Sequence, residues 1–105
     1  MHRLYLIDPG PRPPYYEVAQ ALWGDRDFDS DGDSSIPDAR DWTELTVALR
    51  PDGVERVDID PVSDAGGLVL CIRSDIEVLA RRAGDFLQRR SGGSLAASPP
   101  SPEAG

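Results

Sequence analysis

Hydrophobic and polar residues alternate along the middle of this chain with the period of two that is typical of β-strands. In residues 43–50 the larger apolar side chains fall at every second position, and in residues 54–62 Val57 and Ile59 alternate with Asp58 and Asp60, which predicts strands with one buried face. The segments are joined by Pro51-Asp52-Gly53, whose residue types suit a tight turn. We therefore expect the two segments to form a hairpin.

Two further apolar runs lack this alternation. Residues 4–7 form a short hydrophobic run that ends at a proline-containing segment, and they predict a buried strand. Residues 68–73 are apolar on both faces, which is typical of a central strand covered by helices. A turn is expected at residues 63–67, so the three later strands should form an antiparallel meander.

Helical spacing of apolar residues is found in two segments. In residues 15–23 the apolar positions lie on one face of a helix, with Pro14 at a favoured first position and Gly24 as a stop. A second apolar stripe covers residues 76–87. Before it, residues 74–77 (Ser-Asp-Ile-Glu) have the pattern of a capping box, which predicts a helix N-terminus there.

These elements predict an α+β fold. We expect a mostly antiparallel sheet of three to four strands with two helices, in the order strand, helix, long loop, three strands, helix. Residues 1–93 are expected to form a single domain, since a chain of 105 residues buries roughly two-thirds of its unfolded surface. Residues 94–105 are small, polar and rich in proline, which predicts a disordered tail.

The charge of the chain narrows the classes of partner. Its formal net charge is −8, and its 11 basic residues are all arginine. This balance argues against a nucleic-acid partner, because phosphate contacts require surplus positive charge.

No apolar stretch is long enough to span a membrane, and the run at residues 4–7 is too short for a secretory signal. With Cys71 as the single cysteine, the cytoplasm is the expected compartment.

Most of the negative charge is concentrated in residues 25–41, which we expect to form a long acidic loop. Seven aspartates and two arginines give this segment a charge of −5. One hypothesis makes it the binding surface for a basic protein partner, because clustered carboxylates steer a positively charged surface into contact. The residues expected to contact such a partner are Asp25, Asp27, Phe28, Asp29, Asp31 and Asp33.

The same segment resembles a calcium-binding loop of the EF-hand or dockerin type. Asp27, Asp29 and Asp31 fall at loop positions one, three and five, and Asp38 falls at position twelve. This resemblance implies a single-loop calcium-binding module that uses these four carboxylates as ligands. The following segment favours a strand, where an EF-hand has a helix. A charged loop without any ligand is the third interpretation, and all three remain open.

Catalytic chemistry has little support in the residues. His2 is the only histidine and lies at the chain terminus, which argues against an acid–base or triad mechanism. Cys71 lies within an apolar run and fits a small core residue better than a nucleophile. We therefore expect no enzyme activity and no cofactor.

Residues 41–62 (DWTELTVALRPDGVERVDIDPV) and 79–93 (LARRAGDFLQRRSGG) resemble small bacterial immunity proteins that neutralise polymorphic toxins. The resemblance lies in small size, acidity, a strand-rich middle and a closing amphipathic helix. It implies a non-enzymatic, cytoplasmic, protein-binding inhibitor of a toxin or effector such as a nuclease or deaminase. That function would give the acidic segment a use.

Overall fold

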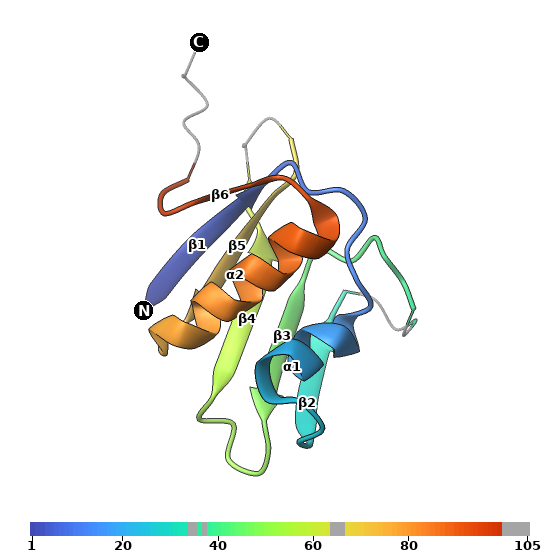
Figure 1. Cartoon of the computed structure of the whole chain (residues 1–105), viewed down its shortest axis with the longest axis vertical. Coiled ribbons are helices and arrows are strands. Elements are labelled where there is room, and N and C mark those ends of the chain that lie inside the picture. Colours follow the sequence, from blue (N-terminus) through green and yellow to red (C-terminus); the bar gives the residue numbers. More distant parts are fainter. Residues whose placement is uncertain (34–35, 37, 64–66, 100–105) are drawn as a thin grey trace.

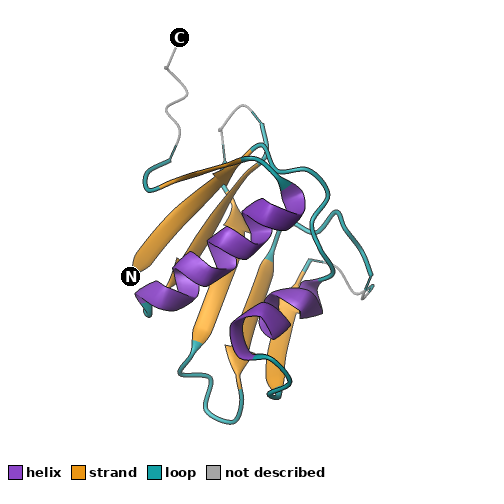
Figure 2. Ribbon diagram, in the orientation of Figure 1, coloured by secondary structure: helices purple, strands orange, loops and turns teal. Residues whose placement is uncertain are grey.

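The computed structural model describes residues 1–33, 36, 38–63 and 67–99. Within these residues the chain is α+β, with one antiparallel sheet of six strands and two helices that cover the same face of the sheet (Figures 1 and 2). The strand order across the sheet is β2-β3-β4-β5-β1-β6. The elements are β1 (His2–Ile7), α1 (Tyr15–Trp23), β2 (Phe28–Gly32), β3 (Leu45–Leu49), β4 (Arg56–Pro61), β5 (Val69–Ser74), α2 (Glu77–Ser91) and β6 (Ser94–Ala96).

The hydrophobic core lies between the helices and one face of the sheet. On β3 and β4 the apolar positions of the sequence pattern are buried, while the residues between them lie on the opposite, open face. Helix α2 packs on β1 and β5, and α1 packs on β3 and on α2. Fully buried side chains come from both layers, among them Leu6, Val18, Leu70, Ile72 and Leu87. The predicted α+β class and the hairpin of β3 and β4 are confirmed.

The acidic segment contains a strand that the sequence pattern did not reveal. Residues 28–32, expected to be part of a loop, form β2 and pair antiparallel with β3, from Phe28↔Leu49 to Gly32↔Leu45. Its polar composition is compatible with a strand because β2 lies at the edge of the sheet and most of it is exposed. The expected sheet of three to four strands is therefore too small, and the expected order omitted β2. Residues 34, 35 and 37 lie outside the described part of the chain.

A second unexpected strand lies beyond the last helix. Residues 94–96, expected to begin a disordered tail, form β6 and pair with β1. Gly92 and Gly93 have φ values of 76° and 87°, and this left-handed backbone reverses the chain after α2. Leu95 then packs against the core. Its side chain buries apolar surface, which the small residues around it cannot do. Residues 100–105 of the expected tail lie outside the described residues.

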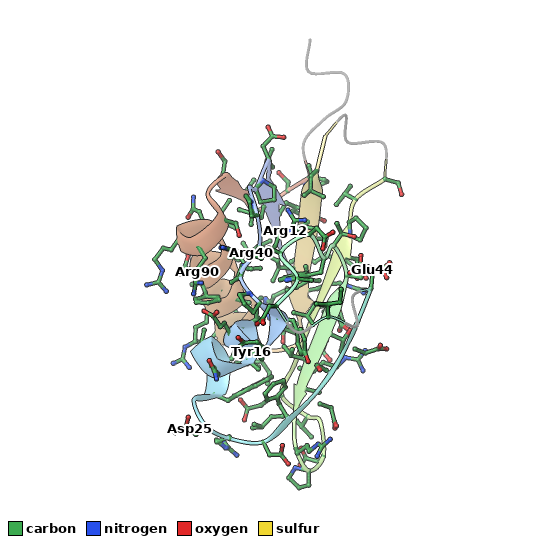
Figure 3. The ribbon with its side chains drawn as sticks, turned by 90° about the vertical axis from the view of Figure 1, so that its right-hand side faces the viewer. Arg12, Tyr16, Asp25, Arg40, Glu44 and Arg90 are labelled. Carbon is green, nitrogen blue, oxygen red and sulfur yellow. The ribbon has the colours of Figure 1, made fainter. Side chains whose placement is uncertain are left out.

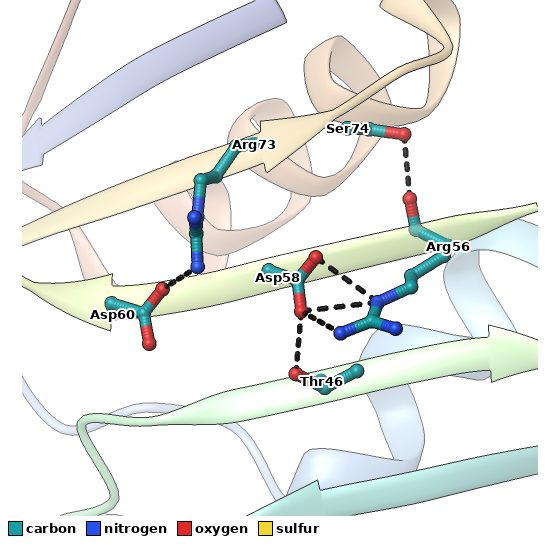
Figure 4. Close-up of polar contacts among 6 residues, drawn as sticks. All are labelled: Thr46, Arg56, Asp58, Asp60, Arg73 and Ser74. Carbon is teal, nitrogen blue, oxygen red and sulfur yellow. Dashed lines mark hydrogen bonds and ion pairs between the residues drawn. The ribbon is translucent and has the colours of Figure 1, made fainter. Parts of the chain in front are cut away.

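The helix at residues 15–23 is confirmed, but the start of α2 differs from the expected capping box. Ser74 is the last residue of β5, and α2 begins at Glu77 without a side-chain cap. The Ser74 hydroxyl donates to the Arg56 carbonyl (2.6 Å) and accepts from the Ile76 N–H (3.1 Å). Ser74 therefore joins β5 to β4 (Figure 4), and its second hydrogen bond links it to the residue before α2.

Arg12 is a buried cation in the connection between β1 and α1. Its side chain is 7% exposed and donates to the carbonyl oxygens of Trp42 (2.8 Å) and Gly10 (2.9 Å). The Arg40 guanidinium donates to the Arg12 carbonyl, and these two arginines lie close together in Figure 3. Burial lowers the pKa of Arg12, while the charges of Asp41 and Asp33 oppose this shift. Arg12 thereby fastens the segment before α1 to the segment before β3.

Candidate functional site

The candidate site is strand β2 with the residues around it. Because side chains alternate along a strand, Phe28, Ser30 and Gly32 lie on the helix-covered side and Asp29 and Asp31 lie on the open face. Phe28 is half-buried and packs against the core. The predicted partner-binding residues thus divide between two faces, and Phe28 is placed as a packing residue.

The backbone of β2 has one free edge. Arg50 N–H donates to the Asp27 carbonyl (3.1 Å) and Asp33 N–H donates to the Glu44 carbonyl (3.2 Å), so the odd-numbered residues of this segment face β3. In an antiparallel ladder the intervening residues turn their N–H and C=O groups the other way. Ser30 and Gly32 are exposed and therefore present their backbone groups to the free edge of the sheet.

Two of the aspartates are already paired within the chain. Arg50 makes ion pairs with Asp27 (3.2 Å) and Asp29 (2.5 Å). The hydrogen bond with Asp29 and the charges of both aspartates raise the pKa of Arg50. All three side chains are exposed, and exposed pairs of this kind contribute little to stability. The pairing does, however, reduce the charge that Asp27 and Asp29 offer to a partner.

Asp33 has a local structural role. Its carboxylate accepts from the Thr43 hydroxyl (2.8 Å) and from the backbone N–H groups of Thr43 and Glu44 (3.1 and 3.2 Å). Burial acts to raise the pKa of Asp33, but these hydrogen bonds outweigh it and the pKa lies below its ordinary value. Asp33 therefore holds together the start of β3 and the end of β2.

Asp25 and Asp31 differ from Asp27, Asp29 and Asp33. Both are exposed, and neither has a hydrogen-bond or ion-pair partner among the residues that the structure describes. Asp25 lies in the turn that leaves α1 (Figure 3), and Asp31 lies on β2. Among the aspartates of residues 25–33, these are the two whose charge is not engaged by another described residue and is available to another protein.

The calcium hypothesis requires Asp27, Asp29, Asp31 and Asp38 to converge. The first three lie on or beside an extended strand, and Asp38 accepts a hydrogen bond from the Tyr16 hydroxyl on α1 (3.2 Å). In the described part of the chain, no group of three histidine, cysteine or carboxylate side chains is placed to hold a metal ion. Ser35, at position nine of the proposed loop, lies outside those residues.

A cleft of about 450 Å³ lies beside β2, toward the first residue of α1. Its lining combines aromatic and apolar residues with polar and acidic ones: Tyr15, Trp42, Leu45, Ser30, Gly32, Asp31, Asp33 and Glu44. Trp42 is almost fully buried and its indole N–H donates to the Pro13 carbonyl (2.8 Å), which fixes the ring. Sequence reasoning did not identify Tyr15 or Trp42 as site residues, because they reach the cleft from segments far apart in the chain.

The open face of the sheet carries one charge pair within β4 and one between β4 and β5 (Figure 4). Asp58 accepts from Arg56 (2.9 Å) and from the Thr46 hydroxyl (2.7 Å), and Asp60 pairs with Arg73. Burial of Asp58 acts to raise its pKa, but the hydrogen bonds from Arg56 and Thr46 and the nearby arginine charges lower it overall. These carboxylates are thus held by the fold, in contrast to Asp25 and Asp31.

Asp58 is expected to make stability depend on pH. A carboxylate with a lowered folded-state pKa contributes stability above its unfolded pKa of about 4, and that contribution is lost as pH falls through the folded value. Asp58→Asn should therefore lower the free energy of unfolding by about 1 kcal/mol at pH 7 and by less at pH 3. Urea unfolding at both pH values measures this. Asp85→Asn, at an exposed position of α2, is the matched control. An equal loss at both pH values would contradict the expectation.

No protein-family model, curated protein or solved structure significantly matches this chain. Within the described residues, no helix has the length and apolar character needed to cross a membrane. Strand β2 and the residues around it are therefore the features of this chain that point to a function.

Proposed function

We propose that this chain is a non-enzymatic binding protein that holds a basic protein partner against β2, and that it inhibits this partner, a toxin or effector, as immunity proteins do. The observation that carries the proposal is a pair of carboxylates that are unpartnered within the described residues: Asp31 on β2, an edge strand with a free backbone, and Asp25 in the turn between α1 and β2. The net charge of −8 supports it, because a negative protein attracts a positive partner at long range.

The surroundings of β2 favour recognition of a protein surface. The cleft adds the partly exposed ring of Tyr15 beside the charged strand, with the buried Trp42 as part of its wall. Aromatic residues next to complementary charges are typical of the parts of an interface that contribute most to affinity. Asp27 and Asp29 contribute in a second way, since a basic partner can compete with Arg50 for their carboxylates.

The double variant Asp25→Asn/Asp31→Asn tests this function. A partner is first isolated from the native host with the wild-type chain and is identified and purified. We expect the double variant to lower its association rate by about tenfold at low salt, with a smaller effect at high salt, because steering depends on charge. Stopped-flow fluorescence of Trp42 in a Trp23→Phe background measures the rate.

The matched control is Asp75→Asn/Asp85→Asn, which makes the same change in net charge at exposed positions next to and on α2. Its association rate should stay within about twofold of the wild type if the position of the charge matters. Equal rates for both double variants would show that β2 is not the binding surface. A partner with an acidic surface would also contradict the proposal.

A further inference from the structure

The free edge of β2 points to the way in which the partner binds. We propose that an extended segment of the partner pairs with β2 and extends the sheet, and that this segment alternates basic and apolar residues. This inference rests on the proposed function, since it takes the partner to be a basic protein. It goes further by naming the backbone geometry and the residue pattern that β2 recognises.

The backbone of β2 supplies the first argument. Ser30 and Gly32 present N–H and C=O groups away from β3, and no described strand pairs with them. An extended peptide that adds to such an edge gains main-chain hydrogen bonds, as in other cases of strand addition. Glycine at position 32 also preserves the pairing of β2 with β3, because a Cβ there would lie 2.5 Å from the Glu44 carbonyl oxygen.

The two faces of β2 supply the second argument. On the open face, an added strand would place every second side chain next to Asp29 and Asp31, and opposite charges on neighbouring strands are favourable. On the other face, the intervening side chains would lie beside Ser30 and the cleft with Tyr15 and Trp42. The first set is therefore basic and the second set apolar or aromatic.

A second copy of this chain is a poorer occupant of the edge. Pairing β2 with β2 would bring two rows of aspartates together, and like charges on facing strands destabilise a sheet. The opposite edge of the sheet, β6, offers only Ser94–Ala96. Charge complementarity thus selects a basic strand from another protein.

The test uses a synthetic peptide in which arginine alternates with valine, and a control peptide of the same composition with its arginines grouped at one end. Fluorescence titration of the full chain should give a dissociation constant at least about tenfold lower for the alternating peptide, because only that order matches both faces of β2. Equal affinity for the two peptides would overturn the residue pattern.

Ser30→Pro tests the backbone contact. Proline removes the N–H at the free edge without removing a bond to β3, and edge strands accept proline at such positions. We expect this variant to bind the alternating peptide at least about tenfold more weakly than Ser30→Ala, which keeps the N–H. Equal binding by the two variants would overturn strand addition.

Hydrogen exchange keeps the proposal testable if Ser30→Pro fails to fold. In the wild type, the alternating peptide should slow exchange of the Ser30 and Gly32 amides, which face the free edge, and leave the Asp29 and Asp31 amides unchanged. The same change in exchange rate at all four amides, or no change at any of them, would overturn strand addition to β2. If Asp25→Asn/Asp31→Asn weakens binding of the purified partner while Ser30→Pro does not, strand addition fails and the proposed function stands. If neither variant weakens binding of the purified partner, both strand addition and the proposed function fail.

Discussion

Replacing Leu87 with alanine is expected to lower the free energy of unfolding by about 2 to 5 kcal/mol, the range for removing a large aliphatic side chain from a packed core. Leu87 is fully buried on α2, the helix that packs on β1, on β5 and on α1. The alanine variant leaves a cavity between the two layers that the rigid sheet cannot close. Urea unfolding followed by circular dichroism measures the loss.

Val78→Ala is the matched control for this change. Val78 lies on the same helix but is 49% exposed, so its truncation removes little buried surface. Val78→Ala should change the free energy of unfolding by no more than about 0.5 kcal/mol, as most surface substitutions do. Similar losses for the two variants would mean that α2 is not packed on the sheet in the way described.

The second large effect is expected for Arg12→Met, which keeps the length of the side chain but removes its donors. The carbonyl oxygens of Trp42 and Gly10 would then lose the guanidinium N–H groups that satisfy them in a buried site. Leaving such acceptors unpaired costs about 1 to 3 kcal/mol each, partly offset because a buried charge is also removed. We expect a net loss of about 2 kcal/mol, measured by urea unfolding.

Arg82→Met, at an exposed position of α2, controls for the loss of one positive charge. Arg12→Lys separates charge from geometry, since a single ammonium cannot reproduce the two directed bonds of the guanidinium. The free energy of unfolding of Arg12→Lys should lie between that of Arg12→Met and that of the wild type. If Arg12→Met proves as stable as Arg82→Met, the bonds of Arg12 are not structural.

Much of the sheet could be predicted because its apolar residues follow the strand period closely. The alternation in β3 and β4 and the apolar run in β5 correspond to strands that the structure confirms. Strand β2 was missed because it has only one large apolar residue, Phe28. A signal was nevertheless present: aspartate recurs at every second position from Asp25 to Asp33, which is the spacing of side chains on one face of a strand.

The candidate site was predictable in charge but not in geometry. The sequence shows that aspartates are concentrated in residues 25–33, yet it does not show which of them are paired. Arg50 reaches Asp27 and Asp29 only because β2 and β3 are neighbours, a contact between segments distant in the chain. The pattern at Ser74 likewise indicated a capping box, while contact with Arg56 on β4 gave the serine a different role.

The position of β1 has a consequence for how the chain folds. Strand β1 lies between β5 and β6, so it pairs with two strands that come much later in the chain (Figure 1). Contacts of such high sequence separation slow folding, because the long intervening loop must close before they form. During synthesis, one side of β1 therefore has no partner until β5 has left the ribosome, and the other side has none until β6 has followed.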